Sequence, residues 1–233
     1  MVKRPQEWFN GGRQVLHKRA QVRNKTPLII YHRGRHGEDI GIEENTIQAF
    51  ERAIKDGARM VEFDVGAELK IAHDPDPGLA APTLEEAMGV ICARCAVNIE
   101  IKSPRAVPGL ARLLDNVFAK GRWRKKQIVL SSFHHQTALL MKRLFPKLCV
   151  GVVNDGVLLP AYIDMLGEQG IDNIHMEHTN VVMDTEGGHK MRSALLQNNM
   201  HIWVWTVNTA SIYDAVIKYG AEAVFTDKPQ LLR

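Results

Sequence analysis

Short apolar runs alternate with amphipathic segments along most of the chain, and this pattern predicts the secondary structure. Eight of the runs have the length and composition of strands, and the segments between them carry apolar residues at helical spacing. The expected strands are residues 28–32, 60–65, 97–102, 128–132, 148–153, 173–177, 202–207 and 223–226. The expected helices are residues 45–56, 84–91, 107–119, 136–144, 161–169, 190–198 and 211–219.

The regular order of strands and helices predicts the fold class. Strands that alternate with helices pair in parallel, and eight of them close an α/β barrel of the (β/α)8 TIM type, which typically has ~250 residues. The chain has 233 residues, which is enough for one such barrel. We therefore expect a single barrel domain over residues 26–233, preceded by a basic helical extension over residues 1–25.

Charged side chains occur where the expected strands end, which is where barrels of this type place their functional residues. Glu62 and Asp64 share one face of their strand because side chains alternate, and Glu100 and Lys102 share one face of the next. Desolvating a carboxylate inside a fold costs on the order of several kcal/mol unless a cation or another partner compensates. A divalent cation is the simplest compensation here.

Two histidines are candidates for proton transfer. His32 ends the first expected strand beside Arg33, and His73 lies beside Asp74, whose carboxylate would orient the imidazole ring. A single histidine at a strand end is more often an ordinary surface or core residue. Two histidines on either side of a metal-bound phosphate, however, would supply the acid and the base that cleavage of a phosphodiester requires.

Four residues are candidates for binding a substrate. Arg33 and Lys102 supply cations suited to phosphate oxygens, although Lys102 also fits a simple counter-ion of Glu100. Trp205, at the end of its strand, would form an aromatic wall for the carbon portion of a substrate. Glu44 begins the first helix, where it fits either an ordinary first-turn acid or a group near the substrate.

The charge of the chain is unevenly distributed. The net charge is +4, but residues 1–25 contain seven basic residues and one acidic residue, so the rest of the chain is slightly acidic. The basic segment suits either a helix that covers the lower end of the barrel or peripheral contact with a membrane surface. No apolar stretch is long enough to span a membrane and no secretory signal is visible, so we expect a cytoplasmic protein. Its three cysteines fit a reducing compartment.

The order of short motifs resembles that of a known family, the glycerophosphodiester phosphodiesterases. Each motif is weak alone, but nine of them follow the order of the family along nearly the whole chain. They are His32-Arg33-Gly34, Glu44-Asn45-Thr46 with Ala49-Phe50, Glu62-Phe63-Asp64-Val65, His73-Asp74, Leu84-Glu85-Glu86, Asn98-Ile99-Glu100-Ile101-Lys102, Ser132-Phe133, Trp205-Thr206-Val207-Asn208 and Thr226-Asp227-Lys228-Pro229.

The resemblance implies hydrolysis of glycerophosphodiesters to sn-glycerol 3-phosphate and an alcohol. It further implies that Glu62, Asp64 and Glu100 bind one Mg²⁺ or Ca²⁺, with Mn²⁺ as an alternative, and that His32 and His73 are the acid and base. Ligands that are all oxygen atoms agree independently with a hard cation.

The chain departs from the family pattern after His73. The family often inserts a small subdomain there, whereas only residues 75–82 separate Asp74 from Thr83. We therefore expect no inserted subdomain and a more open site, which leaves the size and head group of the substrate undetermined.

Two other functions remain open from the sequence. One is cleavage of lysophospholipids or sphingolipids in the manner of a phospholipase D, and the other is a non-catalytic phosphodiester-binding protein. The basic run at residues 122–126 lies at an expected turn, so no nucleic-acid partner is expected. The sequence leaves the oligomeric state open.

Overall fold

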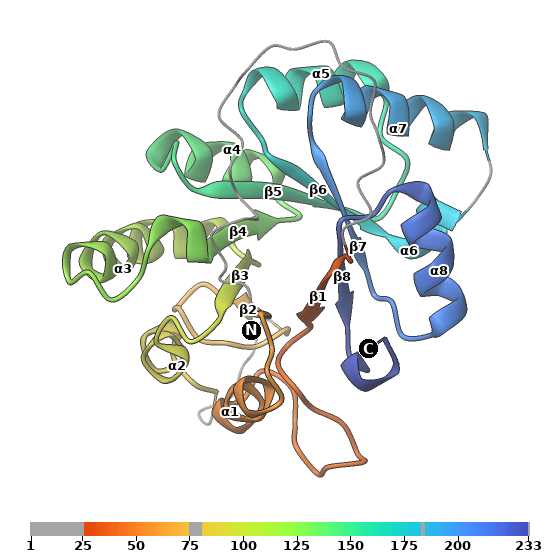
Figure 1. The fold of residues 1–233 in the computed structure, drawn as a ribbon. Coiled ribbons are helices and arrows are strands. Elements are labelled where there is room, and N and C mark those ends of the chain that lie inside the picture. The colour runs from red at the N-terminus through yellow and green to blue at the C-terminus, as the bar shows by residue number, and fades with distance from the viewer. Residues whose placement is uncertain (1–25, 75–80, 183–184, 233) are drawn as a thin grey trace.

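The computed structural model describes residues 26–74, 81–182 and 185–232, and it confirms the (β/α)8 barrel. Eight parallel strands pair in chain order and close into a barrel, with β8 beside β1 (Figure 1). The strands are β1 (Leu28–Tyr31), β2 (Met60–Val65), β3 (Ala96–Ile101), β4 (Ile128–Ser132), β5 (Cys149–Asn154), β6 (Asn173–Glu177), β7 (His201–Trp205) and β8 (Ala223–Thr226).

Helices surround the strands and cover the outside of the barrel (Figure 1). The α-helices are α1 (Ile47–Lys55), α2 (Leu84–Ile91), α3 (Val107–Ala119), α4 (His135–Leu144), α5 (Pro160–Glu168), α6 (His178–Val182), α7 (Glu186–Gln197) and α8 (Ala210–Tyr219). Short 3-10 helices precede α3, precede β4 and follow β8, at Pro104–Ala106, Lys125–Gln127 and Pro229–Leu231.

The structure differs from the expected helices in two places between β6 and β7. The five residues of α6 were not expected to be helical, because one turn is too short to show a helical period. Helix α7 begins at Glu186, four residues before the expected start, because Gly187 and Gly188 weaken the helical signal of its first turn. Thr185 caps this helix by accepting a hydrogen bond from the backbone N–H of Gly188.

The inside of the barrel changes from apolar to charged along the strands. Its lower layer is apolar and is formed by Leu28, Ile30, Met60, Ala96, Val129, Trp203, Ala223 and Phe225. Side chains alternate along a strand, so Glu62 and Asp64 face the same side as Met60, closer to the carboxyl end of β2. The charged groups therefore lie at the end of the barrel where β-to-α loops begin, above an apolar base.

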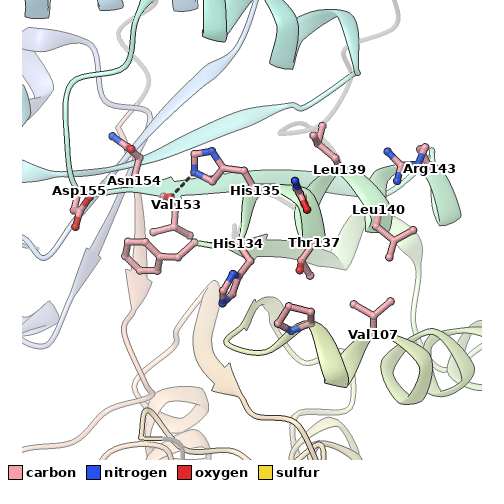
Figure 2. A pocket seen from close by; sticks show the side chains of 13 residues that line it. Val107, His134, His135, Thr137, Leu139, Leu140, Arg143, Val153, Asn154 and Asp155 are labelled. Carbon is pink, nitrogen blue, oxygen red and sulfur yellow. Dashed lines mark hydrogen bonds between the residues drawn. The ribbon is translucent and has the colours of Figure 1, made fainter.

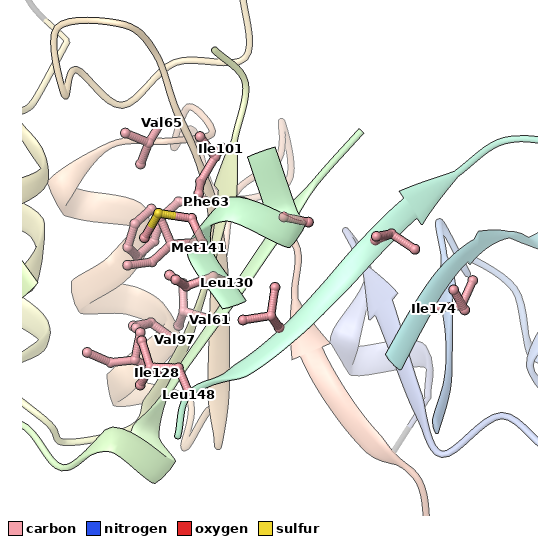
Figure 3. Close-up of a cluster of buried hydrophobic side chains, with 14 of the residues drawn as sticks. Val61, Phe63, Val65, Val97, Ile101, Ile128, Leu130, Met141, Leu148 and Ile174 are labelled. Carbon is pink, nitrogen blue, oxygen red and sulfur yellow. The ribbon is translucent and has the colours of Figure 1, made fainter. Parts of the chain in front are cut away.

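The opposite face of the strands packs against the helices and forms the main core. On β2 this face carries Val61, Phe63 and Val65, all fully buried, and Met141 of α4 belongs to the same cluster (Figure 3). Burial of large apolar side chains contributes roughly 1.5–3 kcal/mol each. This layer holds the strands in register, so it also fixes the relative positions of the polar residues on their inner face.

Two segments named in the sequence analysis fall wholly or partly outside the described residues. The basic extension over residues 1–25 lies outside the described residues, as do residues 75–80 of the connection after Asp74. At the described ends of that connection, the backbone N–H of Ile71 donates to the carbonyl of Pro82, and that of Leu84 donates to the carbonyl of Leu69, so these two ends lie side by side. Among the described helices, none has the length and apolar character needed to cross a membrane.

Candidate active site

Three acidic side chains meet at the carboxyl ends of β2 and β3. Asp64 and Glu100 are directly opposite each other in the register of these strands. One oxygen from each of Glu62, Asp64 and Glu100 lies within 4.8 Å of the others, and the side chains are 2%, 2% and 14% exposed. Residues on two strands thus converge as the side-chain period predicts.

The acidic group is electrostatically unfavourable without a cation. Burial, together with the charges of Asp64 and Glu100, raises the pKa of Glu62 well above its usual value. Burial and the charge of Asp64 likewise raise the pKa of Glu100. Glu62 Oε1 is buried and has no hydrogen-bond partner among the described residues. Three converging carboxylates with an unpaired oxygen fit the ligand preferences of Mg²⁺ or Ca²⁺.

Two cations lie against these carboxylates. Lys102 Nζ is 2.9 Å from Glu100 Oε1 and 3.5 Å from Asp64 Oδ1, and Arg33 Nε is 3.2 Å from Asp64 Oδ2. Burial opposes the charge of both cations, but the neighbouring carboxylates outweigh it and raise the pKa of Arg33 and of Lys102. Both side chains therefore remain charged beside the candidate metal site.

The loop after β1 holds Arg33 over the acidic group. Gly34 has a φ of +89°, and a Cβ added there would lie 2.7 Å from the Cβ of Ala49 in α1. The backbone N–H of Arg33 donates to Glu62 Oε2 at 2.9 Å. The His-Arg-Gly motif and the Ala-Phe pair in α1 thus form one close contact between loop and helix.

Glu44 and Asn45 support this arrangement from the start of α1. Glu44 Oε1 accepts a hydrogen bond from Arg33 Nη1 at 2.6 Å, and Glu44 does not line the cavity of the site. Asn45 Nδ2 donates to Asp64 Oδ2 at 3.0 Å. The structure therefore places Glu44 against Arg33, where it orients the guanidinium, and places Asn45 against a candidate metal ligand.

His32 is held at one side of the acidic group. Its Nδ1 lies 2.6 Å from Asp227 Oδ1, and its Nε2 lies 3.9 Å from Glu62 Oε2. Because a carboxylate only accepts hydrogen bonds, Nδ1 carries a proton and the other ring nitrogen faces the site. Asp227 is held in turn by Asn208, whose Nδ2 donates to Asp227 Oδ2 at 2.8 Å.

The charge of Asp227 is strongly stabilised. Burial opposes its ionisation, but the contacts with His32 and His36 outweigh this effect, so the pKa of Asp227 lies well below its usual range. In the sequence, Asp227 belongs to the last motif of the resemblance and directly follows the last expected strand, which assigns it no role. Its contact with His32 spans 195 positions, so only the closure of the barrel reveals it.

His73 reaches the same cavity from the connection after β2. Its side chain is 45% exposed, and Nδ1 lies 3.0 Å from Asp74 Oδ1, as expected from their adjacency. The cavity has a volume of about 190 Å³. It brings together the two histidines with the acids, the cations and the aromatic side chains, and it is lined by His32, Arg33, Glu62, Asp64, His73, Glu100, Lys102, Phe133, Val153, His175, Trp205, Thr206 and Phe225.

Aromatic side chains form one wall of the cavity. The rings of Trp205 and Phe133 meet edge to face with centroids 5.7 Å apart, and Lys102 Nζ lies 5.6 Å from the centroid of Phe133. Trp205 Nε1 donates to the backbone carbonyl of His175 at 3.2 Å. These contacts fix the Trp205 indole against Phe133, and the Phe133 ring also lies next to Lys102.

His175 lines the cavity and was not identified from the sequence. It is 2% exposed, stacks on Trp203 with centroids 4.9 Å apart, and burial lowers its pKa to about 3. Burial therefore favours the neutral form of its imidazole ring. Its position could have been found from side-chain alternation on β6. Asn173, His175 and Glu177 share one face of this strand, and Glu177 is its last residue, at the carboxyl end.

Comparison with known proteins places this chain in the family that its motifs resemble. The family model named glycerophosphoryl diester phosphodiesterase family matches residues 32–67 and 68–231, which include both histidines and the acidic group. The chain belongs to this family. The protein is therefore a phosphodiester hydrolase, and the non-catalytic alternative does not hold.

Relatives of this phosphodiesterase extend over most of its length. A glycerophosphodiester phosphodiesterase of Caldanaerobacter subterraneus subsp. tengcongensis is 26% identical, over 88% of this chain and 96% of its own. A solved glycerophosphodiester phosphodiesterase of Parabacteroides distasonis has a TM-score of 0.70 at 24% identity, over 89% of this chain and 95% of its own. A phosphodiesterase of Oleispira antarctica, solved in complex with the product sn-glycerol-3-phosphate, has a TM-score of 0.69 at 23% identity, over 89% and 95%.

Proposed function

We propose that this phosphodiesterase hydrolyses glycerophosphodiesters to sn-glycerol 3-phosphate and an alcohol. The observation that carries the proposal is one cavity in which His32 and His73 face three carboxylates and two cations. A similarly folded phosphodiesterase binds sn-glycerol-3-phosphate, which supports the same product here.

Glu62, Asp64 and Glu100 would bind one divalent cation, Mg²⁺ or Ca²⁺, with Mn²⁺ as an alternative. Such an ion supplies positive charge at the phosphate and acts as a Lewis acid. The unpaired Glu62 Oε1 and the raised pKa of Glu62 support this ligand set. With the carboxylates holding such an ion, Arg33 and Lys102 would contact the phosphate oxygens and stabilise the negative charge that accumulates there.

His32 and His73 would divide the two proton transfers. One removes a proton from the nucleophile, which is water or the neighbouring hydroxyl of the glycerol, and the other protonates the leaving alkoxide. Asp227 keeps His32 Nδ1 protonated, so the exchange on this residue takes place at Nε2. Trp205 would contact the carbon atoms of the glycerol from the aromatic wall.

Product analysis on a panel of glycerophosphodiesters tests this proposal. We expect sn-glycerol 3-phosphate as a product, loss of activity in EDTA, and recovery with Mg²⁺, Ca²⁺ or Mn²⁺. Replacing His32 or His73 by Ala should reduce kcat roughly 10²- to 10⁴-fold if each transfers a proton. Glu62→Gln should weaken activation by the metal.

His201→Ala is a suitable control for these variants. His201 is also paired with a carboxylate, Glu222, but it begins β7 at the opposite end of the barrel. It should retain wild-type turnover. If His32→Ala and His73→Ala turn over normally while the metal is bound, the assignment of the acid and base is wrong.

A further inference from the structure

A buried histidine lies across the barrel from the carboxylates. His175 is on β6, which is opposite β2 in the closed order of the strands. It is 2% exposed, and it lines the catalytic cavity together with Glu62 and Asp64. Because this cavity has a volume of only about 190 Å³, a substrate whose phosphate lies at the acidic group brings the far end of its carbon portion close to His175.

Aromatic contacts hold the imidazole ring of His175 in one orientation. The ring stacks on Trp203 with centroids 4.9 Å apart and an interplanar angle of 9°, and the tilted ring of Phe225 lies at a centroid distance of 4.9 Å. The backbone carbonyl of His175 accepts a hydrogen bond from Trp205 Nε1 at 3.2 Å. A side chain that is already held in place loses little conformational entropy when it binds a ligand.

Asn173, two residues earlier on the same face of β6, determines which nitrogen of the ring carries the proton. Asn173 Nδ2 donates to Cys149 Sγ at 3.0 Å, whereas its Oδ1 is buried and has no hydrogen-bond partner among the described residues. A Cβ added at Gly151 would lie 1.9 Å from Asn173 Oδ1 and 2.7 Å from His175 Nε2, so these two atoms meet over the glycine. An amide oxygen only accepts hydrogen bonds, so the proton of the neutral ring is more stable on Nε2, beside it.

The other ring nitrogen, Nδ1, is then an acceptor without a partner. A neutral imidazole has one N–H and one acceptor nitrogen, and burial favours this neutral form because it lowers the pKa of His175 to about 3. No described residue forms a hydrogen bond with Nδ1, and Nδ1 is not among the fully buried unpaired atoms, whereas Nε2 is. Nδ1 is therefore the ring nitrogen that a ligand in the cavity can reach.

We propose that His175 recognises the glycerol portion of the substrate by accepting a hydrogen bond at Nδ1 from its terminal hydroxyl. The proposal rests on the phosphodiesterase activity proposed above and assigns a specificity residue to it. The other glycerol hydroxyl neighbours the phosphate ester and stays near His32 and His73, so the terminal hydroxyl is the one that extends toward β6. A diester without this hydroxyl would leave the acceptor unpaired in a buried place, which disfavours its binding.

The test compares two substrates that differ by one hydroxyl. We would measure kcat/KM for sn-glycero-3-phosphocholine and for its 1-deoxy analogue, 2-hydroxypropyl phosphocholine, which keeps the hydroxyl that neighbours the phosphate ester. The wild-type enzyme should prefer glycerophosphocholine about tenfold or more, as expected for one hydrogen bond to a buried acceptor. His175→Leu should remove most of this preference, mainly by slowing the hydrolysis of glycerophosphocholine. His175→Gln keeps an acceptor oxygen and should keep part of the preference.

His135→Leu provides the matched control. In α4, His135 Nε2 donates to the backbone carbonyl of Val153 at 3.0 Å (Figure 2). His135 does not line the catalytic cavity but a separate groove of about 900 Å³ beside Phe133. This variant should keep the wild-type preference between the two substrates.

Two outcomes would overturn the inference while leaving hydrolysis of glycerophosphocholine in place. One is equal kcat/KM values for the two diesters in the wild-type enzyme, a measurement that does not depend on the folding of any variant. The other is an undiminished preference in His175→Leu. If neither diester is hydrolysed with any of the three metals, the proposed function itself fails.

Discussion

At the scale of single residues, the site depends on partners that hold its functional groups. Glu44 fixes Arg33, and Asp227 fixes His32, while neither lines the catalytic cavity. The sequence identified both Arg33 and Glu44 as candidates for substrate binding, but not their contact with each other. The pairing of His32 with Asp227 was not foreseen, because the first and last strands meet only when the barrel closes.

The role of Asp227 can be tested by Asp227→Asn. An amide can present Nδ2 to His32 and favour the wrong tautomer, so we expect kcat to fall about 10- to 100-fold, as for other residues that orient a functional histidine. KM should change little, and the pH dependence of kcat should change. Steady-state kinetics over a range of pH would measure both effects.

Asp214→Asn is the control, since Asp214 is an exposed acid on α8. It should behave as the wild type. A normal kcat and an unchanged pH profile in Asp227→Asn, with the fold intact by circular dichroism, would show that Asp227 only contributes to stability.

At the scale of elements, most helices and strands were predictable because their signals are local. The Thr83 capping box is an example: Thr83 Oγ1 accepts from the backbone N–H of Glu86, and Glu86 Oε2 accepts from the backbone N–H of Thr83. Gly57 and Gly220 likewise follow the ends of helices at positive φ, a position where glycine is a common local signal. Helix α6 was missed because it has no local signal of this kind.

The contact between the loop after β1 and α1 gives a prediction at this scale. In Gly34→Ala, the new Cβ would lie 2.7 Å from the Cβ of Ala49 and 2.9 Å from its backbone carbon, so the loop must move. Overpacking of this kind typically costs about 1–3 kcal/mol. Because Arg33 is part of the same loop and would move with it, kcat should fall as well. Chemical denaturation and kinetics would measure the two effects.

Gly57→Ala separates the clash from the backbone conformation. Gly57 also has a positive φ, of +80°, but a Cβ added there meets no atom within 4 Å. The variant should lose about 1–2 kcal/mol from the left-handed conformation alone and keep its turnover. If both variants lose the same stability and remain fully active, the close packing of Gly34 on Ala49 is not important for the site.

At the scale of the whole molecule, the barrel combines an apolar base with a charged upper end, and the transition between them affects stability. His175 lies at this transition, where it stacks on Trp203 and makes a tilted ring contact with Phe225, both of the apolar layer. It is buried in its neutral form, since burial lowers its pKa to about 3. In the unfolded chain a histidine titrates near 6.5.

This difference predicts how stability depends on pH. Below pH 6.5 the unfolded state binds a proton at His175 and the folded state does not, so the free energy of unfolding falls as the pH falls. Between pH 6.5 and pH 5 this single group should cost about 2 kcal/mol. His175→Gln should show a shallower decrease by this amount in urea denaturation at the two pH values.

His189→Gln provides the comparison for that measurement, since it removes a histidine that lies outside the barrel, in α7. Its pH dependence should follow the wild type more closely than that of His175→Gln. Identical slopes for His175→Gln and the wild type would mean that His175 takes up a proton in the folded state.

The sequence by itself determined the order of the strands and of every described α-helix except α6, the barrel and the group of carboxylates, because side-chain alternation and helical spacing are properties of neighbouring residues. Only the tertiary structure decided that Asp227 contacts His32, that His175 lines the cavity and that Glu44 lies against Arg33. It also revealed the groove beside Phe133, which is formed by residues from 104 to 155. These features depend on distances between distant parts of the chain, and closing the barrel sets those distances.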